Sequence, residues 1–268
     1  MLQQIVDFRE EGLALGRTLD GLAETDFELV TAFKGWTIND VLRHLHVGDI
    51  MANSSITDPD GFQRLLADTR AKRAAGLSPR DDARERLAML GGAAMLARWR
   101  SGLEELCGLL ASCDPEARLK WAGPDMGVRM FATARQMEVW AHGQEVYDVL
   151  GLDRAPTERL RNIATIGVRT FGWTFVNRGL AMPPEAPHVR LMGPSGAIWE
   201  WNPPSSGTRV EGAALEFCQV VAQVRNVADT GLVVTGDTAR RWMAIAQCFA
   251  GPPETPPAPG TRRRSARR

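Results

Sequence analysis

One segment, residues 135–148, limits most strongly what this chain can fold into. It contains no proline and several strong helix formers, so it predicts an α-helix. Glu138 and His142 lie four residues apart within it, and this spacing stacks both side chains on one helix face, one turn apart. A carboxylate and an imidazole so placed can bind one divalent metal ion, with Zn²⁺ the first candidate. Because Glu and His meet at this spacing on many solvated helices, the pair needs a third ligand from elsewhere in the chain.

The chain has four histidines, and two of them lie in a second predicted helix, residues 36–50. Thr37 is placed to cap this helix, with Asp40 as its N3 partner in an Asp version of the capping box. The apolar stripe of the helix consists of Ile38, Val41, Leu42 and Leu45. His44 falls at the edge of that stripe and faces the core, whereas His46 lies roughly 200° around the helix from it. We therefore choose His44 as the third ligand.

Four long helices are predicted before residue 152, and they fit a bundle with a metal site in its core. They cover residues 2–22, 36–50, 78–113 and 130–150. The third begins at Ser78, an N-cap followed by proline at the first helical position, and it is expected to continue through Gly91 and Gly92. Residues 58–61 predict a turn, and residues 62–77 are charged and only partly periodic.

The pattern changes after residue 156, and the second part of the chain is predicted to be α+β. Its elements are a helix at 157–180, a β-hairpin at 188–201, a helix at 213–224, a strand at 232–236 and a helix at 238–249. The end of the chain is rich in proline and arginine, a composition typical of disorder. Its cluster at 262–264 could contact nucleic acid or anionic lipid, but a solvated tail without function is the preferred interpretation. The predicted domains are residues 1–152, 153–250 and 251–268.

The composition is that of an ordinary globular protein, and it argues against several classes of partner. Hydrophobic residues make up 44% and charged residues 24% of the 268 residues, as in soluble domains. The formal net charge is zero, so no global field favours nucleic acid or an anionic membrane. The N-terminal residues do not resemble a signal peptide, and no run approaches the roughly 20 apolar residues of a membrane helix. The four cysteines lack CxxC spacing, so reduced thiols and a cytoplasmic protein are expected.

The run Trp36–Leu45, followed far downstream by Glu138–His142, resembles the N-terminal domain of the mycothiol-dependent maleylpyruvate isomerases. That domain belongs to the DinB-like metal-binding four-helix bundles. The second half, from residues 189–194 through 233–237, resembles the smaller α+β domain often attached to it. The resemblance covers nearly the whole chain up to Gly251 and is strongest to a largely uncharacterised metal-binding branch. It implies an α-helical DinB-like four-helix bundle followed by a small α+β domain. Carried over residue by residue, the family's metal triad is His44, Glu138 and His142.

The resemblance implies a metal-dependent enzyme, either an isomerase or a thiol transferase, that acts on a small molecule. In the isomerases the ion activates the sulfur of mycothiol, which adds to an enedione so that the double bond can rotate. Two imidazoles and one carboxylate leave at least one coordination position open, as in catalytic zinc sites, although Ni²⁺, Mn²⁺ and Fe²⁺ suit the same ligands. Mycothiol is accordingly a candidate cosubstrate. A monomer and a homodimer are both compatible with the sequence.

Three further residues are candidates for a role at the site. Tyr147 and Asp148 follow His142 on the same helix and could orient a ligand or contact substrate. The isomerases also use an arginine of the C-terminal domain near the metal. Arg225 is the position chosen for that role, with Arg209 as the alternative. A surface arginine without a catalytic role is the simpler interpretation of either one.

Two other functions fit the same metal ligands. One is a different metal-dependent enzyme, such as a hydrolase, lyase or cyclase of specialised metabolism, which would act without a thiol. The other is a non-catalytic module that holds a structural ion or a small ligand, and there a fourth protein ligand, for which His46 is the nearest candidate, would close the coordination sphere. For His44 or His142 taken alone, a core histidine is the simpler interpretation. The metal site is favoured because three positions match together.

Overall fold

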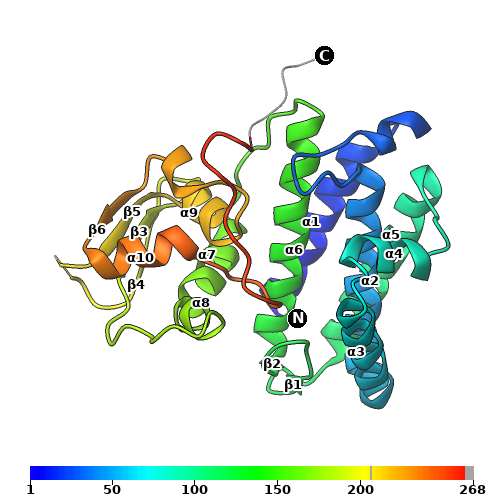
Figure 1. The fold of residues 1–268 in the computed structure, drawn as a ribbon, viewed down its shortest axis with the longest axis horizontal. Helices are drawn as coiled ribbons and strands as arrows, with labels where there is room; N and C mark the ends of the chain where they lie inside the picture. The colour runs from blue at the N-terminus through cyan, green and yellow to red at the C-terminus, as the bar shows by residue number, and fades with distance from the viewer. Residues whose placement is uncertain (206, 263–268) are drawn as a thin grey trace. The chain divides into compact units, whose positions relative to one another are not determined.

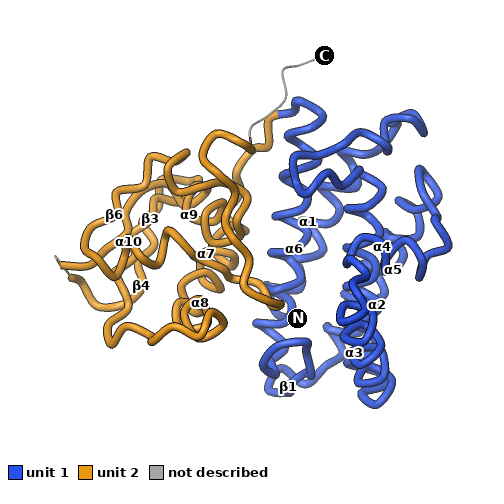
Figure 2. Tube along the Cα trace, viewed as in Figure 1, with its two compact units in different colours: residues 1–152, 265–268 blue, residues 153–264 orange. Residues whose placement is uncertain are grey.

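The computed structural model describes residues 1–205 and 207–262. The chain forms two compact units that divide between Leu152 and Asp153 (Figure 2). Figure 1 labels their helices and strands. No helix in the described ranges is both long and apolar enough to span a membrane.

Unit 1 is a helical bundle. Its elements are α1 (Gln3–Leu19), η1 (Glu24–Glu28), α2 (Ile38–Thr57), α3 (Pro59–Ala74), α4 (Pro79–Arg86), α5 (Gly92–Ser112), β1 (Arg118–Leu119), β2 (Met126–Gly127) and α6 (Val128–Val149). The four long helices α1, α2, α5 and α6 pack against one another (Figure 1). The shorter helices α3 and α4 connect α2 to α5, and the antiparallel pair β1–β2 leads into α6.

The bundle is held together by an apolar core shared by all four long helices. Trp99 and Leu103 on α5 and Phe131 on α6 are almost completely buried, and burial of one such side chain contributes about 1.5–3 kcal/mol. At Gly12, α1 approaches α5 so closely that a Cβ would lie 2.2 Å from a methyl carbon of Leu103. A side chain of α5 therefore packs directly against the backbone of α1.

The start of α2 follows the predicted capping box. The Thr37 hydroxyl accepts a hydrogen bond from the Asp40 amide at 3.3 Å, and the Asp40 carboxylate accepts one from the Thr37 amide at 3.1 Å. Arg84 on α4 also donates twice to the Asp40 carboxylate, at 2.8 Å each. Burial alone would raise the pKa of Asp40, but these hydrogen bonds outweigh it and hold the pKa below its ordinary value. Asp40 thus caps α2 and ties it to α4.

The predicted helix over residues 78–113 is broken in two, so the prediction that it continues through the glycine pair is wrong. Helix α4 ends at Arg86, and α5 begins at Gly92. Gly92 adopts φ +59°, and a Cβ there would lie 1.6 Å from a Glu24 carboxylate oxygen. Glycine allows this left-handed conformation at little steric cost. The break lets the Asn39 side chain accept from the Gly92 amide at 2.7 Å and Glu24 accept from the Ala93 amide at 3.1 Å.

The predicted turn at residues 58–61 is also different in the structure, where it forms the first turn of α3. Asp58 is the N-cap, and its carboxylate accepts a hydrogen bond from the Gly61 amide at 2.9 Å. Pro59 occupies the first helical position, where its missing N–H costs nothing. Asp58 therefore lies between the end of α2 and the start of α3, as the predicted turn requires, but the residues from Pro59 onward already belong to α3.

Unit 2 is α+β. Its elements are α7 (Leu160–Arg169), α8 (Phe171–Val176), β3 (His188–Met192), β4 (Ile198–Trp201), β5 (Arg209–Ala213), α9 (Ala214–Val221), η2 (Val227–Asp229), β6 (Val233–Thr235) and α10 (Asp237–Ile245). The strands form one sheet in the order β4-β3-β5-β6. The predicted hairpin is the antiparallel pair β3–β4, and β5 joins β3 in parallel. The single helix predicted over residues 157–180 is instead divided at Thr170 into α7 and α8.

Residues 251–262 differ from the disorder that their composition predicts. Asn226 donates a hydrogen bond to the Pro257 carbonyl at 2.8 Å, and the Asp229 carboxylate accepts from the Gly260 amide. Arg262 donates to the Gln223 carbonyl at 2.8 Å. The Asn226 and Asp229 side chains thus bind backbone groups of this segment, and its Arg262 side chain binds the backbone of Gln223. The remainder of the predicted tail, residues 263–268, lies outside the described residues.

Candidate metal centre

Three side chains from two helices of the bundle converge at one point. His44 comes from α2, and Glu138 and His142 come from α6. One ligand-type atom of each lies within 4.8 Å of the others. The Glu138 Oε2 atom is 3.5 Å from His44 Nε2 and 3.6 Å from His142 Nε2. The structure therefore brings together the three residues that the sequence analysis selected as metal ligands.

The three side chains are partly exposed, to 32% for His44, 24% for Glu138 and 12% for His142. None of the three side chains is therefore sealed from solvent. Desolvation would raise the pKa of Glu138, but the hydrogen bond with His44 and the charges of both imidazoles lower it to about 2. Glu138 is consequently a carboxylate at neutral pH, which is the state that binds a cation.

Two aromatic side chains form a wall against the histidines. The Trp36 ring lies parallel to that of His142, with an interplanar angle of 2° and 5.8 Å between centroids, and meets His44 edge-on at 5.2 Å. Phe33 contacts His142 edge-on at 4.9 Å. Trp36 is 6% exposed, so it closes one side of the group to water. These contacts fix the planes of both imidazoles.

The loop before α2 brings this wall into place. Val30 and Thr37 form an isolated antiparallel bridge, and the Thr31 amide donates to the Trp36 carbonyl at 2.8 Å. Between them, Lys34 and Gly35 both adopt positive φ, 51° and 67°. This left-handed pair reverses the chain tightly and turns the aromatic residues on either side of it toward the histidines. The sequence analysis identified Trp36 as part of the family motif but did not predict its contact with the two histidines.

His46 faces away from the three ligand-type residues, as its position on the helix predicts. Its Nε2 accepts a hydrogen bond from Arg98 on α5 at 3.3 Å, and a Cβ on Gly102 would lie 2.8 Å from the ring. Burial and the charge of Arg98 lower the pKa of His46 to about 4. His46 therefore packs between α2 and α5, and its proposed place as a fourth ligand is wrong.

The other predicted site residues form hydrogen bonds with partners other than the three ligand-type residues. The Thr18 hydroxyl donates to the Tyr147 hydroxyl at 2.7 Å, which links α1 to α6. Asp148 is buried and accepts from Gln144 on the same helix at 3.0 Å. Arg225 follows α9 in unit 2 and donates to the Val224 carbonyl at 3.1 Å. Their catalytic roles stay predictions.

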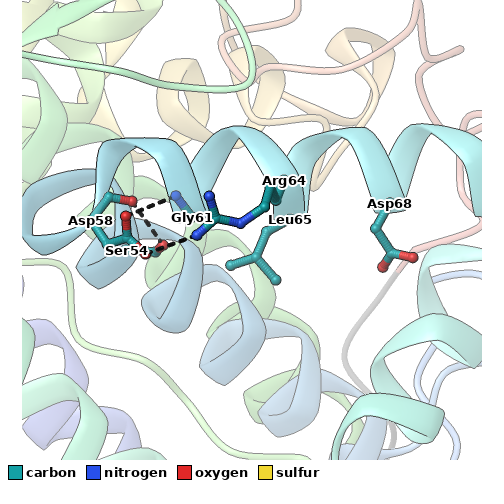
Figure 3. A pocket seen from close by; sticks show the side chains of 6 residues that line it. All are labelled: Ser54, Asp58, Gly61, Arg64, Leu65 and Asp68. Carbon is teal, nitrogen blue, oxygen red and sulfur yellow. Dashed lines mark hydrogen bonds and ion pairs between the residues drawn. The ribbon is translucent and has the colours of Figure 1, made fainter.

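A groove of about 450 Å³ opens elsewhere in unit 1, at the start of α3 (Figure 3). Its lining consists of Ser54, Asp58, Gly61, Arg64, Leu65 and Asp68. Arg64 and Asp58 form an ion pair across it at 3.4 Å. None of the three ligand-type residues lines this groove, so it is distinct from the candidate metal centre.

Residues 8–147 match the family model described as the mycothiol maleylpyruvate isomerase N-terminal domain. This match spans more than half of the 268 residues. The chain belongs to this family. An uncharacterized protein of Mycobacterium tuberculosis, found in two strains, is 39% identical over 249 residues, which cover 93% of this chain and 96% of that protein.

Two solved structures share the fold of this family member. The crystal structure of the mycothiol-dependent maleylpyruvate isomerase aligns with a TM-score of 0.56 over 87% of this chain and 91% of that chain, at 15% identity. A mutant of the same enzyme aligns with a TM-score of 0.54 over 88% and 92%, also at 15% identity. The predicted fold class, a DinB-like helical bundle followed by a smaller α+β part, is confirmed.

Proposed function

We propose that His44, Glu138 and His142 bind one divalent metal ion, and that the protein is an enzyme that uses this ion to activate a low-molecular-weight thiol or water for isomerisation or S-transfer. The convergence of the three donor atoms within 4.8 Å carries the proposal. Family membership supports an enzyme that acts on a small molecule, and the family's name suggests mycothiol as the thiol. Zn²⁺ is the first candidate because two imidazoles and one carboxylate are its common catalytic ligands.

The spacing of the donor atoms fits such an ion. Bonds of about 2.0–2.1 Å at tetrahedral angles separate neighbouring ligand atoms by roughly 3.3 Å. The two separations from Glu138 Oε2, 3.5 Å and 3.6 Å, are near this value. They are long for ordinary N–H···O hydrogen bonds, which are typically about 2.9–3.0 Å. The two separations from Glu138 therefore support a cation shared with each histidine.

A metal ion at this position would lower the pKa of a bound thiol or water, so that the deprotonated nucleophile forms near neutral pH. The chain's own residues supply the rest of the site. Glu138 offers a negative charge, while Trp36 and Phe33 hold the imidazole planes and exclude water from one side. The exposed side of His44 leaves access for a small substrate.

Metal content tests this proposal directly. Mass spectrometry of the untagged protein should find near-stoichiometric metal, and Glu138→Ala and His44→Ala should each lose it. His188→Ala is the matched control, because His188 also lies 3.5 Å from a carboxylate, that of Glu200, but no third ligand-type side chain within residues 1–205 and 207–262 joins this pair. A folded parent that takes up no added Zn²⁺, or a Glu138→Ala variant with full metal content, would refute the proposed site.

Thiol dependence tests the chemistry. The metal-loaded protein should convert maleylpyruvate, or transfer mycothiol to an electrophile, only when mycothiol is present. Glu138→Ala is the negative control and should show no turnover under the same conditions. Turnover that is unchanged without any thiol would instead favour a hydrolase, lyase or cyclase on the same bundle.

A further inference from the structure

Two charged residues lie buried beside the candidate metal centre, on the same two helices. Arg135 on α6 is 4% exposed and Asp49 on α2 is 1% exposed. Arg135 donates to Asp49 Oδ1 from Nη2 at 2.9 Å and from Nε at 3.3 Å. Its Nη2 also donates to the Leu45 carbonyl at 3.1 Å. Three hydrogen bonds from one guanidinium therefore connect α6 to α2.

The Arg135–Asp49 ion pair lies near the proposed metal ligands along both helices. Asp49 comes five residues after His44, whereas Arg135 comes three residues before Glu138. Since both pairs are in contact, α2 and α6 run antiparallel here, and the ion pair lies on one side of the ligands along both helices. At 1.5 Å of rise per residue, the distances along the axes are about 7.5 Å on α2 and about 4.5 Å on α6. The ion pair thus lies about one helical turn from the ligands, in the same interface between α2 and α6.

Helix α2 is adapted to the guanidinium at this layer. A Cβ on Gly48 would lie 2.7 Å from Arg135 Nη2, so a side chain there would displace the arginine. Leu45, whose carbonyl receives Arg135, is the residue directly after His44. The backbone that carries His44 is therefore held by the same group that bonds Asp49.

Stability alone is a poor explanation for this arrangement. Removing two charges from water is costly, and well-packed apolar residues of similar volume usually hold two helices at least as well as a buried ion pair. What a forked arginine adds is direction, because its planar donors fix both distance and rotation. Those are the two quantities that decide whether ligands on separate helices meet.

We propose that Arg135 and Asp49 are positioning residues of the metal centre, whose ion pair sets the spacing and rotation of α2 against α6 and thereby the separation of the His44 and Glu138 donor atoms. This inference rests on the proposed metal function. Neither residue touches the ion or the substrate. Both act through the ligands that their helices carry.

Metal affinity and coordination geometry provide the test. The double variant Arg135→Met/Asp49→Leu removes both charges together, so neither is left buried without its partner. We expect its dissociation constant for Zn²⁺, measured by competition with a chelator, to rise about 10–100-fold, as for other residues that orient metal ligands. We also expect its Co²⁺ absorption bands to change in position and intensity, because they report ligand geometry.

Two controls separate positioning from general stability. Arg9→Met/Glu104→Leu removes an ion pair of 2.7 Å between α1 and α5, which carry no proposed ligand. Leu103→Ala lowers stability by deleting fully buried atoms on α5. Both variants should keep the Zn²⁺ affinity and the Co²⁺ spectrum of the parent.

A double variant with the parent's affinity and spectrum would overturn the inference, and so would an equal change in Leu103→Ala. If the double variant does not fold, the single variant Arg135→Lys tests the same inference. Lysine keeps the charge but loses the fork that reaches Asp49 and Leu45 together, so we expect a smaller loss of affinity that still exceeds threefold. A parent that binds no metal would refute the proposed function itself, and this inference with it.

Discussion

Glu138 determines the charge balance of the proposed centre, because it is the one anionic donor among the three. Its pKa of about 2 reflects hydrogen bonding and the charges of both histidines, which together outweigh burial. A metal ligand must be deprotonated before the ion binds, and Glu138 meets this condition throughout the neutral range. A folded state that requires the carboxylate loses stability only as the pH falls through the range from about 4.5 toward 2.

His46 should dominate a different part of the pH profile. Its pKa falls from 6.5 to about 4 on folding, so between these values the unfolded chain binds more protons than the folded one. Acidification through this window should therefore reduce the free energy of unfolding, by up to about 3 kcal/mol for this residue. In urea titrations of the metal-free protein, His46→Gln should show a shallower dependence between pH 6.5 and 4. Parallel curves for parent and variant would contradict this explanation.

At the scale of elements, the break between α4 and α5 lets polar side chains from two other elements reach the start of α5. Asn39 on α2 binds the amide of Gly92, and Glu24 on η1 binds that of Ala93. Arg43, also on α2, donates to the carbonyls of Met89 and Leu90. The connection is thus organised by the same segment of α2 that carries His44.

Substitution of Gly92 should show how much this connection matters. Gly92→Ala forces a side chain into φ +59° and against Glu24, so we expect a loss of about 1–3 kcal/mol in the free energy of unfolding. Gly108→Ala is the matched control in the same helix, because a Cβ there meets nothing within 4 Å. It should stabilise the protein by up to about 1 kcal/mol. Equal effects of the two substitutions would show that the turn at Gly92 is not required.

The sequence predicted those elements that are determined by interactions between residues close together in the chain. The Thr37–Asp40 capping box located the start of α2, and helical spacing put Glu138 and His142 on one face. The same rules extended one helix through Gly91 and Gly92, since glycine only weakens a helix unless tertiary contacts favour a break. Those contacts, from Glu24 and Asn39, come from distant positions and leave no local pattern.

The surroundings of the ligands were beyond sequence reasoning for the same reason. Trp36 and Phe33 reach the histidines because Lys34 adopts a left-handed conformation that is uncommon outside glycine, asparagine and aspartate. Arg135 and Asp49 are 86 residues apart in the chain, and either one, read alone, is an ordinary charged residue on a helix. Only the packing of α2 against α6 shows that they meet.

At the scale of the whole molecule, the proposed metal ligands all belong to unit 1. All three ligand-type residues precede the division at Leu152. The family model likewise matches residues 8–147, which all lie in unit 1. Unit 2 has its own sheet and its own buried residues, among them Phe217 and Trp242. Metal binding should therefore act first on the bundle.

Hydrogen exchange should localise this effect. Zn²⁺ at 100 times its dissociation constant stabilises the binding-competent state by about 2.7 kcal/mol. We expect slower amide exchange in α2 and α6 on addition of Zn²⁺, with little change in strands β3 to β6. Glu138→Ala should show neither change. Equal protection across both units would contradict a centre built from unit 1 alone.

The donor atoms of His44 and Glu138 meet although the residues are 94 positions apart in the chain. An ion shared between them would close a large ring of polypeptide, much as a disulfide does, and would take more entropy from the unfolded chain than from the folded one. The ring is complete once His142 has been synthesised, before any strand of the sheet in unit 2 exists. A growing chain could therefore bind its ion, and so stabilise the bundle, while the rest of the protein is still being synthesised.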